Sequence, residues 1–129
     1  MGNIYSAQNV AAYFIYELNE QRTFINAASL QYLLTKVEEV WREQFGHSAF
    51  REKVWNFDIH GYIVKEVADT YEESGIHHLF LPAKDWFLQF GQFQLQYKTY
   101  SVPAFTNQEQ DLINRIVNEY LEVFLSKAS

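Results

Sequence analysis

The sequence predicts a mainly helical α+β domain with four to five helices and two or three short strands. Apolar residues recur at helical spacing over three segments, apolar and polar residues alternate over a segment near residue 95, and isolated glycines and prolines separate these segments. A chain of 129 residues has the size of one domain. We therefore expect a single domain over residues 1–129, without linkers or internal repeats.

The first helix is expected over residues 7–20. Serine at position 6 is a favoured N-cap, because its hydroxyl can accept a hydrogen bond from a free backbone N–H of the first turn. Val10, Tyr13 and Phe14 then recur on one face. A polar break from residue 19 to residue 23 ends the helix.

A second, longer helix is predicted to begin after Asn26 and to end at Gly46, where glycine suits the left-handed conformation that commonly follows a helix. The spacing i, i+3, i+4, i+7 marks the face that packs on a core, and it is followed by Leu30, Leu33, Leu34, Val37, Val40 and Trp41. The three leucines are therefore expected in the core, together with Val64.

The pattern changes from helical to extended between residues 50 and 62. Residues that favour strands are concentrated here: Val54, Trp55, Phe57 and Ile59. We expect a short strand at this place. A third helix is then predicted from Gly61 to about Ser74, with Gly75 as its C-terminal stop.

In the last third of the chain, Pro82 is predicted to begin a short helix, because proline is favoured in the first turn; its apolar residues are Trp86, Phe87 and Phe90. A strand follows, because every second residue is apolar or aromatic, or is a threonine, and polar residues lie between them. The residues expected on its apolar face are Phe93, Leu95, Tyr97 and Thr99. Thr106 and Glu109 have the spacing of a capping box, which predicts a last helix to about residue 126.

Composition excludes several classes of function. Without cysteine the chain has no disulfide framework, thiolate metal site or thiol nucleophile. Ten basic residues against sixteen acidic ones give a net charge of −6, and the basic residues are not clustered as nucleic-acid binding requires. No apolar segment reaches the roughly 18 residues that cross a bilayer, and no signal peptide opens the chain. We expect a cytoplasmic protein that binds neither nucleic acid nor membranes and favours a basic partner.

Candidate catalytic and metal-binding residues are few. Adjacent His77 and His78 point in different directions on either a helix or a strand. Asp58 and His60 would share one face of a strand, where a carboxylate can orient an imidazole, but no third ligand or nucleophile accompanies them at a recognisable spacing. No glycine-rich phosphate loop is present. We assign no catalytic, metal or cofactor residue and expect no cofactor; an enzyme built around Asp58 and His60 is the least favoured alternative.

Aromatic residues make up 18% of the chain, with 3 Trp, 9 Tyr and 11 Phe. They could all belong to a core rich in rings, since large apolar side chains favour burial. Alternatively, part of them could lie at the surface as anchors of an interface, a role in which Trp and Tyr are enriched. Both interpretations are compatible with the sequence.

Two motifs resemble those of Panacea domains. Residues Leu30-Gln31-Tyr32-Leu33-Leu34-Thr35 are similar to the family's Leu-Gln-Lys-Leu-Leu-Tyr helix, with Tyr32 in place of the lysine and Thr35 in place of the tyrosine. Trp55 stands where the family has a tryptophan, and Gly61-Tyr62-Ile63-Val64 stands where Gly-Pro-Val is usual. The similarity covers roughly residues 9–120, and the chain ends before the histidine-containing tail that commonly follows in the family.

The resemblance implies a compact helical domain with a small sheet and a non-enzymatic, phage-associated or antitoxin-like protein. Such a protein binds a partner, a toxin, and neutralises it by direct contact. In this interpretation Tyr32, Trp55 and Tyr62 are predicted to contact the partner, because two of them depart from the family at its most characteristic positions. The alternative function is that of a stand-alone prophage protein that self-associates as a homo-oligomer or modulates a host factor.

Overall fold

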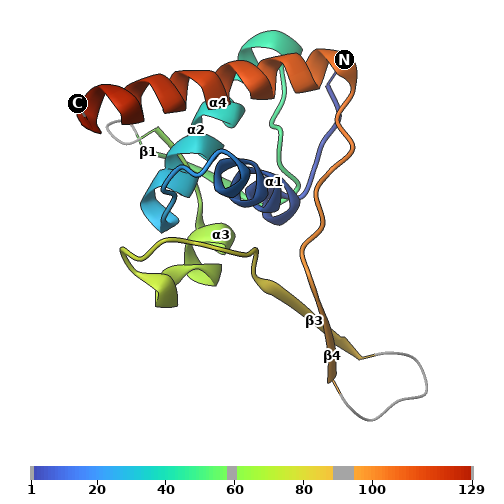
Figure 1. Ribbon diagram of the computed structural model, residues 1–129. Coiled ribbons are helices and arrows are strands. Elements are labelled where there is room, and N and C mark those ends of the chain that lie inside the picture. Colours follow the sequence, from blue (N-terminus) through green and yellow to red (C-terminus); the bar gives the residue numbers. More distant parts are fainter. Residues whose placement is uncertain (1, 58–60, 89–94, 129) are drawn as a thin grey trace.

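The computed structural model describes residues 2–57, 61–88 and 95–128. Three long helices form its body: α1 (Ala7–Glu20), α2 (Ala27–Phe45) and α4 (Asn107–Ala128). Both α1 and α4 pack on α2. In Figure 1, α4 lies above α1 and crosses α2, and the short helix α3 (Lys65–Thr70) with the 3₁₀ turn η1 (Glu72–Ser74) lies beneath them.

The β component within the described residues consists of two antiparallel hairpins. In the first, β1 (Val54–Phe57) pairs with β2 (Gly61–Val64), with Trp55 opposite Ile63. In the second, β3 (Lys84–Leu88) pairs with β4 (Leu95–Thr99). The first hairpin lies against α2, whereas Figure 1 shows the second projecting away from the helices. The predicted α+β class, mainly helical with a small β component, is therefore confirmed.

The core lies where α1, α2 and α4 meet. Its largest fully buried apolar side chains are Trp41, Phe14, Ile15, Leu18, Ile25, Leu30, Leu33, Leu34 and Ile113. The prediction that the three leucines of α2 and Val64 belong to the core is confirmed. Complete burial of one such side chain contributes roughly 1.5–3 kcal/mol, so this junction supplies much of the energy of folding.

The helix ends follow the predicted capping. The Ser6 hydroxyl accepts a hydrogen bond from the Gln8 N–H at 3.3 Å, and Asn26 Oδ1 accepts one from the Ser29 N–H at 2.9 Å. Helix α2 ends at Gly46, which has a φ of 76°. Glu52 adds a contact that was not predicted, because its carboxylate accepts the Ala7 N–H at 2.7 Å, where a negative charge suits the dipole of α1.

Glu109 joins the N-terminal segment to the start of α4. The predicted capping box is present, since the Thr106 N–H donates to the Glu109 carboxylate at 2.8 Å and the Glu109 N–H donates to the Thr106 hydroxyl at 3.3 Å. The same buried carboxylate accepts the Asn3 N–H at 2.6 Å and the Tyr5 hydroxyl. Burial alone would raise the pKa of Glu109, but the hydrogen bonds from Tyr5, Asn3 and Thr106 outweigh burial and lower that pKa.

Two predictions about local structure are wrong. Residues 61–64 form β2 and not the first turn of a helix, so α3 begins only at Lys65. The β-branched residues before Lys65 fit a strand, and pairing with β1 stabilises them there. Residues after Pro82 form β3 and not a short helix, because β4 offers them a complete antiparallel partner. Ile59 and Phe93, which were predicted in strands, and Phe90, which was predicted in the short helix, lie outside the described residues.

Candidate functional site

Five rings from four separate segments follow one another over one face of the molecule. We call this set the ring track, and it consists of Tyr32, Tyr120, Phe24, His78 and Phe80. The ring centroids of Tyr32 and Tyr120 are 6.5 Å apart, those of Phe24 and His78 are 5.5 Å apart, and those of His78 and Phe80 are 4.5 Å apart. The Tyr120 hydroxyl donates a hydrogen bond to the Phe24 carbonyl at 2.9 Å, which connects the two parts of the track.

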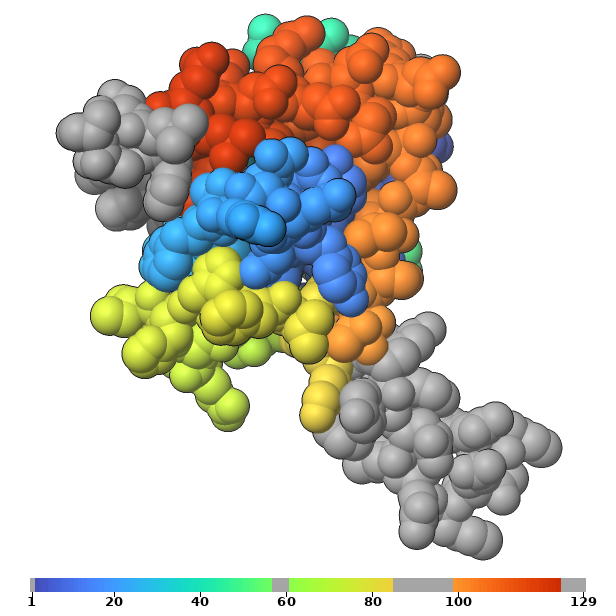
Figure 2. Space-filling view, viewed as in Figure 1, coloured from blue at the N-terminus to red at the C-terminus, as the bar shows by residue number. Residues whose placement is uncertain are grey.

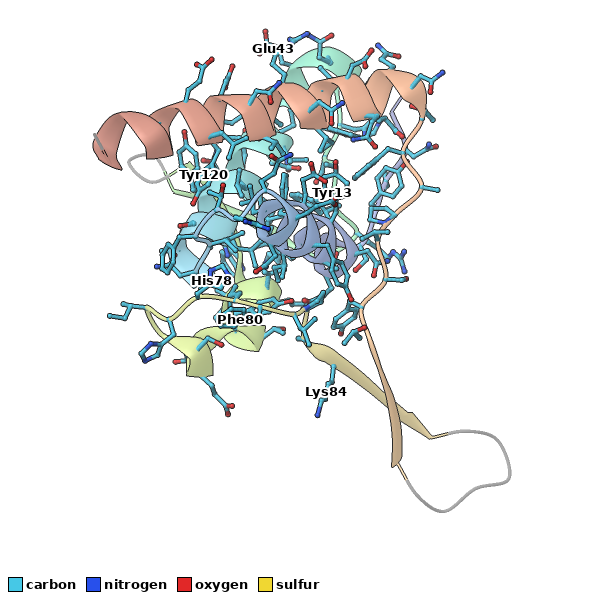
Figure 3. The ribbon with its side chains drawn as sticks, in the orientation of Figure 1. Tyr13, Glu43, His78, Phe80, Lys84 and Tyr120 are labelled. Atoms are coloured by element: carbon cyan, nitrogen blue, oxygen red, sulfur yellow. The ribbon has the colours of Figure 1, made fainter. Side chains whose placement is uncertain are left out.

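Figure 3 shows the labelled Tyr120, His78 and Phe80 in sequence from α4 toward α3. In Figure 2, the light-blue residues around 20–30 lie on the same face, between α4 in red and the yellow residues around 70–82. The ring track therefore runs across three neighbouring parts of the surface.

Much of the track is exposed. Phe80 is 73% exposed, Tyr32 45% and Phe24 40%. Ile76 and Leu81, on the same segment as Phe80, are also exposed. Single exposed apolar side chains are common on soluble proteins, but a contiguous group of them is typical of a binding surface.

His78 fixes the segment that carries Phe80. The Ile25 N–H donates to His78 Nδ1 at 3.1 Å, and His78 Nε2 lies 2.7 Å from Asn19 Oδ1. Because Nδ1 accepts, the proton of a neutral imidazole is on Nε2, which donates to Asn19. The Leu79 N–H also donates to the Ile25 carbonyl at 2.8 Å, and the Asn19 amide donates to the Leu79 carbonyl at 2.8 Å. The exposed rings are therefore presented by a firmly bonded segment without regular secondary structure.

A hollow opens beside Tyr32, between α2 and α4. Its volume is about 440 Å³, and it is lined by Ala28, Ser29, Tyr32, Tyr120 and Val123. The Ser29 hydroxyl donates to Asn26 Oδ1 at 3.0 Å, and the Tyr120 hydroxyl donates to the Phe24 carbonyl. Both hydroxyl protons are thus used within the fold, so the hollow presents mostly hydrocarbon and ring surface.

The structure places the three predicted contact residues on different surfaces. Tyr32 belongs to the ring track. Trp55 lies on β1, is 42% exposed and has the Lys53 ammonium 4.1 Å from its ring centroid. Tyr62 is half-buried on β2, and the Arg42 guanidinium lies 4.9 Å from its ring centroid. A role in partner contact stays a prediction for all three.

Sequence reasoning did not identify the other members of the track. Tyr120 lies within the predicted last helix, and Phe24 directly follows the polar break at residues 19–23; neither was predicted to lie at a binding surface. An apolar run from residue 76 to residue 81 is visible in the sequence, but it has neither helical nor strand periodicity. Such a run could have indicated an exposed apolar segment.

The polar residues of the motif that resembles Panacea domains have structural partners. The Gln31 amide donates to the Val64 carbonyl at 3.2 Å and accepts the Val64 N–H at 2.8 Å, as a neighbouring strand would. The Thr35 hydroxyl, one turn later, donates to the Tyr62 carbonyl. Helix α2 thereby covers the edge of β2 that does not pair with β1.

Several buried or half-buried carboxylates accept hydrogen bonds within the fold. Glu38 is fully buried and accepts hydrogen bonds from the Arg42 guanidinium at 2.7 Å, the Ser48 hydroxyl at 2.9 Å and the Ala49 N–H at 2.9 Å. Glu52 and Glu109 act similarly at the starts of α1 and α4. Hydrogen bonds therefore satisfy these carboxylates within the domain.

In the part of the chain that the structure describes, no group of three or more His, Cys, Asp or Glu side chains is arranged to hold a metal ion. Asp58 and His60, the pair considered for an enzyme, lie outside the described residues. None of the helices, over their described residues, combines the length and apolar character needed to cross a membrane.

Comparison of the chain with protein-family models, with curated proteins and with solved structures found no match.

Proposed function

We propose that this protein is a non-enzymatic, antitoxin-like or phage-associated cytoplasmic domain that neutralises a partner protein by direct contact. The observation that carries this proposal is the ring track, in which exposed Tyr32, Phe24 and Phe80 belong to two groups of contacting rings, and the hydrogen bond from the Tyr120 hydroxyl to the Phe24 carbonyl connects the two groups. Aromatic anchors of this kind contribute a large part of the binding energy at protein interfaces.

The charge of the chain supports a basic partner. With a net charge of −6, the domain attracts a cationic protein at long range, which speeds the encounter between them. Slow release would then come from the apolar contacts of the track, since most differences in affinity between related complexes lie in the dissociation rate. A folded domain seated on the working surface of a toxin would block that surface sterically.

The resemblance to Panacea domains supports the same proposal, because members of that family bind and neutralise toxins by contact. It rests on the motif at residues 30–35, on Trp55 and on residues 61–64. In this chain, Gln31 and Thr35 of that motif hold β2, whereas Tyr32 between them is exposed. The motif therefore combines a structural role with a surface ring available to a partner.

Affinity isolation of the tagged protein from its native cells tests the proposal, with mass spectrometry of the isolated material and a native mass of the complex. We expect one stoichiometric, basic protein that arrests growth when produced alone and no longer does so when this chain is co-produced. The tag alone serves as the control. Recovery of the chain as a monomer or a homo-oligomer would instead favour the stand-alone prophage protein.

A further inference from the structure

We propose that the hollow between α2 and α4 is an anchor site for a cationic, amphipathic helix of the partner. One large apolar side chain of that helix would enter the hollow, and its basic neighbours would face carboxylates on α4. This inference rests on the proposed function, because it names the surface and the chemistry through which the partner binds.

The size and lining of the hollow favour an apolar side chain. About 440 Å³ is within the roughly 300–1,000 Å³ typical of binding pockets, and the lining comes from one turn of α2 and one turn of α4. A polar ligand would find the Ser29 and Tyr120 hydroxyl protons already donated within the fold. An apolar side chain needs no such donors and would cover the exposed parts of Tyr32 and Val123.

The charges on α4 favour a cationic partner. Tyr120 and Val123 line the hollow, and Glu119 and Glu122 each precede one of them by one position. Residues three apart lie on the same side of a helix. The exposed Glu119 and Glu122 therefore form one row along α4, next to the row of Tyr120 and Val123 that lines the hollow. No ion pair within the described residues involves either carboxylate.

The nearest positive charge on α2 does not cancel this row. The Lys36 ammonium lies 5.5 Å from the Tyr32 ring centroid, but it also pairs with the Glu39 carboxylate at 3.6 Å. The surface around the hollow thus has unpaired negative charge on α4 and a partly neutralised positive charge on α2. A lysine or arginine next to the anchoring side chain would face carboxylates.

The shape of the site favours a helix as the occupant. A cleft between two helices accepts the apolar face of an amphipathic helix, with anchors spaced at i, i+3, i+4 and i+7. The ring track extends from Tyr120 through Phe24 and His78 to Phe80, so further anchors of the same helix would meet rings beyond the hollow. A single apolar stripe on the partner would therefore contact several members of the track.

A defined peptide tests this without knowledge of the cognate partner. The probe is a labelled peptide of about 18 residues, long enough to be helical, with leucine at i, i+3, i+4 and i+7 and lysine elsewhere. Its counterpart has glutamate in place of each lysine. Affinity is measured by fluorescence anisotropy, and the bound surface is mapped by amide chemical shifts of the full chain.

We expect the cationic peptide to bind at least tenfold more tightly than the anionic one and to shift the amides of Ser29, Tyr32, Tyr120 and Val123. Tyr32→Ala should weaken binding at least tenfold, and Val123→Ser should also weaken it. Tyr16→Ala is the matched control and should change affinity less than twofold, because Tyr16 is 40% exposed, close to the 45% of Tyr32, but lies on α1 outside the ring track.

Charge reversal gives an independent readout. The double variant Glu119→Lys, Glu122→Lys should lose the preference for the cationic peptide, whereas Glu43→Lys should keep it. Glu43 is exposed on α2, and Figure 3 shows it on the far side of α4 from His78 and Phe80. Added salt should also weaken binding of the cationic peptide less in the double variant than in the unaltered protein, because fewer carboxylates attract the peptide.

Three results would overturn the inference. The first is equal affinity for the two peptides, or no binding of either. The second is a set of chemical shifts centred on the acidic surface of α3 and η1, with Tyr32→Ala no more harmful than Tyr16→Ala. The third is a concentration-dependent dimer that Tyr32→Ala abolishes, which would assign the hollow to a second copy of the chain.

The peptide experiment and the isolation from native cells can fail independently. If a stoichiometric toxin is found and Tyr32→Ala does not weaken its binding, the proposed function stands and the anchor site is wrong. If the cationic peptide binds in the hollow and no protein partner is isolated, the anchor site stands and the antitoxin-like function is wrong.

Discussion

Replacement of Gln31 by alanine should destabilise the domain by about 2–4 kcal/mol. The amide of Gln31 makes two hydrogen bonds to Val64, at 2.8 and 3.2 Å, and Val64 is only 1% exposed. Without the amide, a buried N–H and a buried carbonyl lose their partners, and each unsatisfied group costs about 1–3 kcal/mol. The lower part of that range applies if water reaches the edge of β2. Such a loss is a large fraction of the 5–15 kcal/mol typical of a whole domain.

Urea unfolding of three variants measures this effect. Gln44→Ala is the control, because Gln44 is an exposed glutamine of the same helix and the change in helix propensity of a few tenths of a kcal/mol is the same. Gln31→Glu should have an intermediate cost, since a carboxylate can accept the Val64 N–H but cannot donate to its carbonyl. Amide exchange at Val64 should accelerate in Gln31→Ala. Equal stability of Gln31→Ala and Gln44→Ala would refute the conclusion that Gln31 holds β2.

Three further predictions concern hydrogen-bonded side chains. The pKa of Glu109 is lowered in the folded state, so its ionised carboxylate adds to the free energy of unfolding at pH values above the ordinary pKa of 4.5, and this stabilisation is lost as pH falls below that value. The loss of stability caused by Glu109→Gln, measured by urea unfolding, should therefore be smaller in acid than at neutral pH. Glu38→Ala should cost about 2–4 kcal/mol in thermal or urea unfolding, because buried donors lose their acceptor, whereas Glu39→Ala next to it should change stability by less than about 1 kcal/mol. His78→Ala should cost about 2 kcal/mol and accelerate amide exchange in residues 76–81, whereas His77→Ala at the exposed neighbouring position should do neither.

Each of these predictions has a contradicting result. A deficit of Glu109→Gln that does not change between neutral and acidic pH would mean that the carboxylate is not preferentially ionised in the fold. Equal costs for Glu38→Ala and Glu39→Ala would show that the buried carboxylate is dispensable. Unchanged exchange in His78→Ala would mean that other contacts fix the segment.

The starts of the three long helices and the end of α2 were predictable because their signals are local. The caps at Ser6 and Asn26, the glycine at 46 and the capping box of α4 all lie within a few residues of the ends that they define. The strands were less predictable because their stability depends on a partner elsewhere in the chain. Residues 61–64 and 84–88 can each be interpreted as helical in isolation, and only pairing with β1 and β4 decides between the two.

The candidate site was predictable only in part, for the same reason. Tyr32 was identified at a position where the motif departs from its family, and its exposure agrees with a surface role. The ring track, however, depends on contacts such as that between Tyr120 and Phe24, which are 96 residues apart in the sequence. No local pattern reports that these two segments meet, because helix packing and the hydrogen bonds of His78 bring them together.

The packing of α2 separates the residues that fold the domain from the residue that would recognise a partner. Gln31 and Thr35 point toward β2 and bond its backbone, whereas Tyr32 is about 100° further around the helix and lines the hollow beside α4. A different side chain at position 32 would therefore change the shape of the hollow without removing any bond to β2. In this helix, the choice of partner and the stability of the fold can vary independently, even though the residues responsible are adjacent in the sequence.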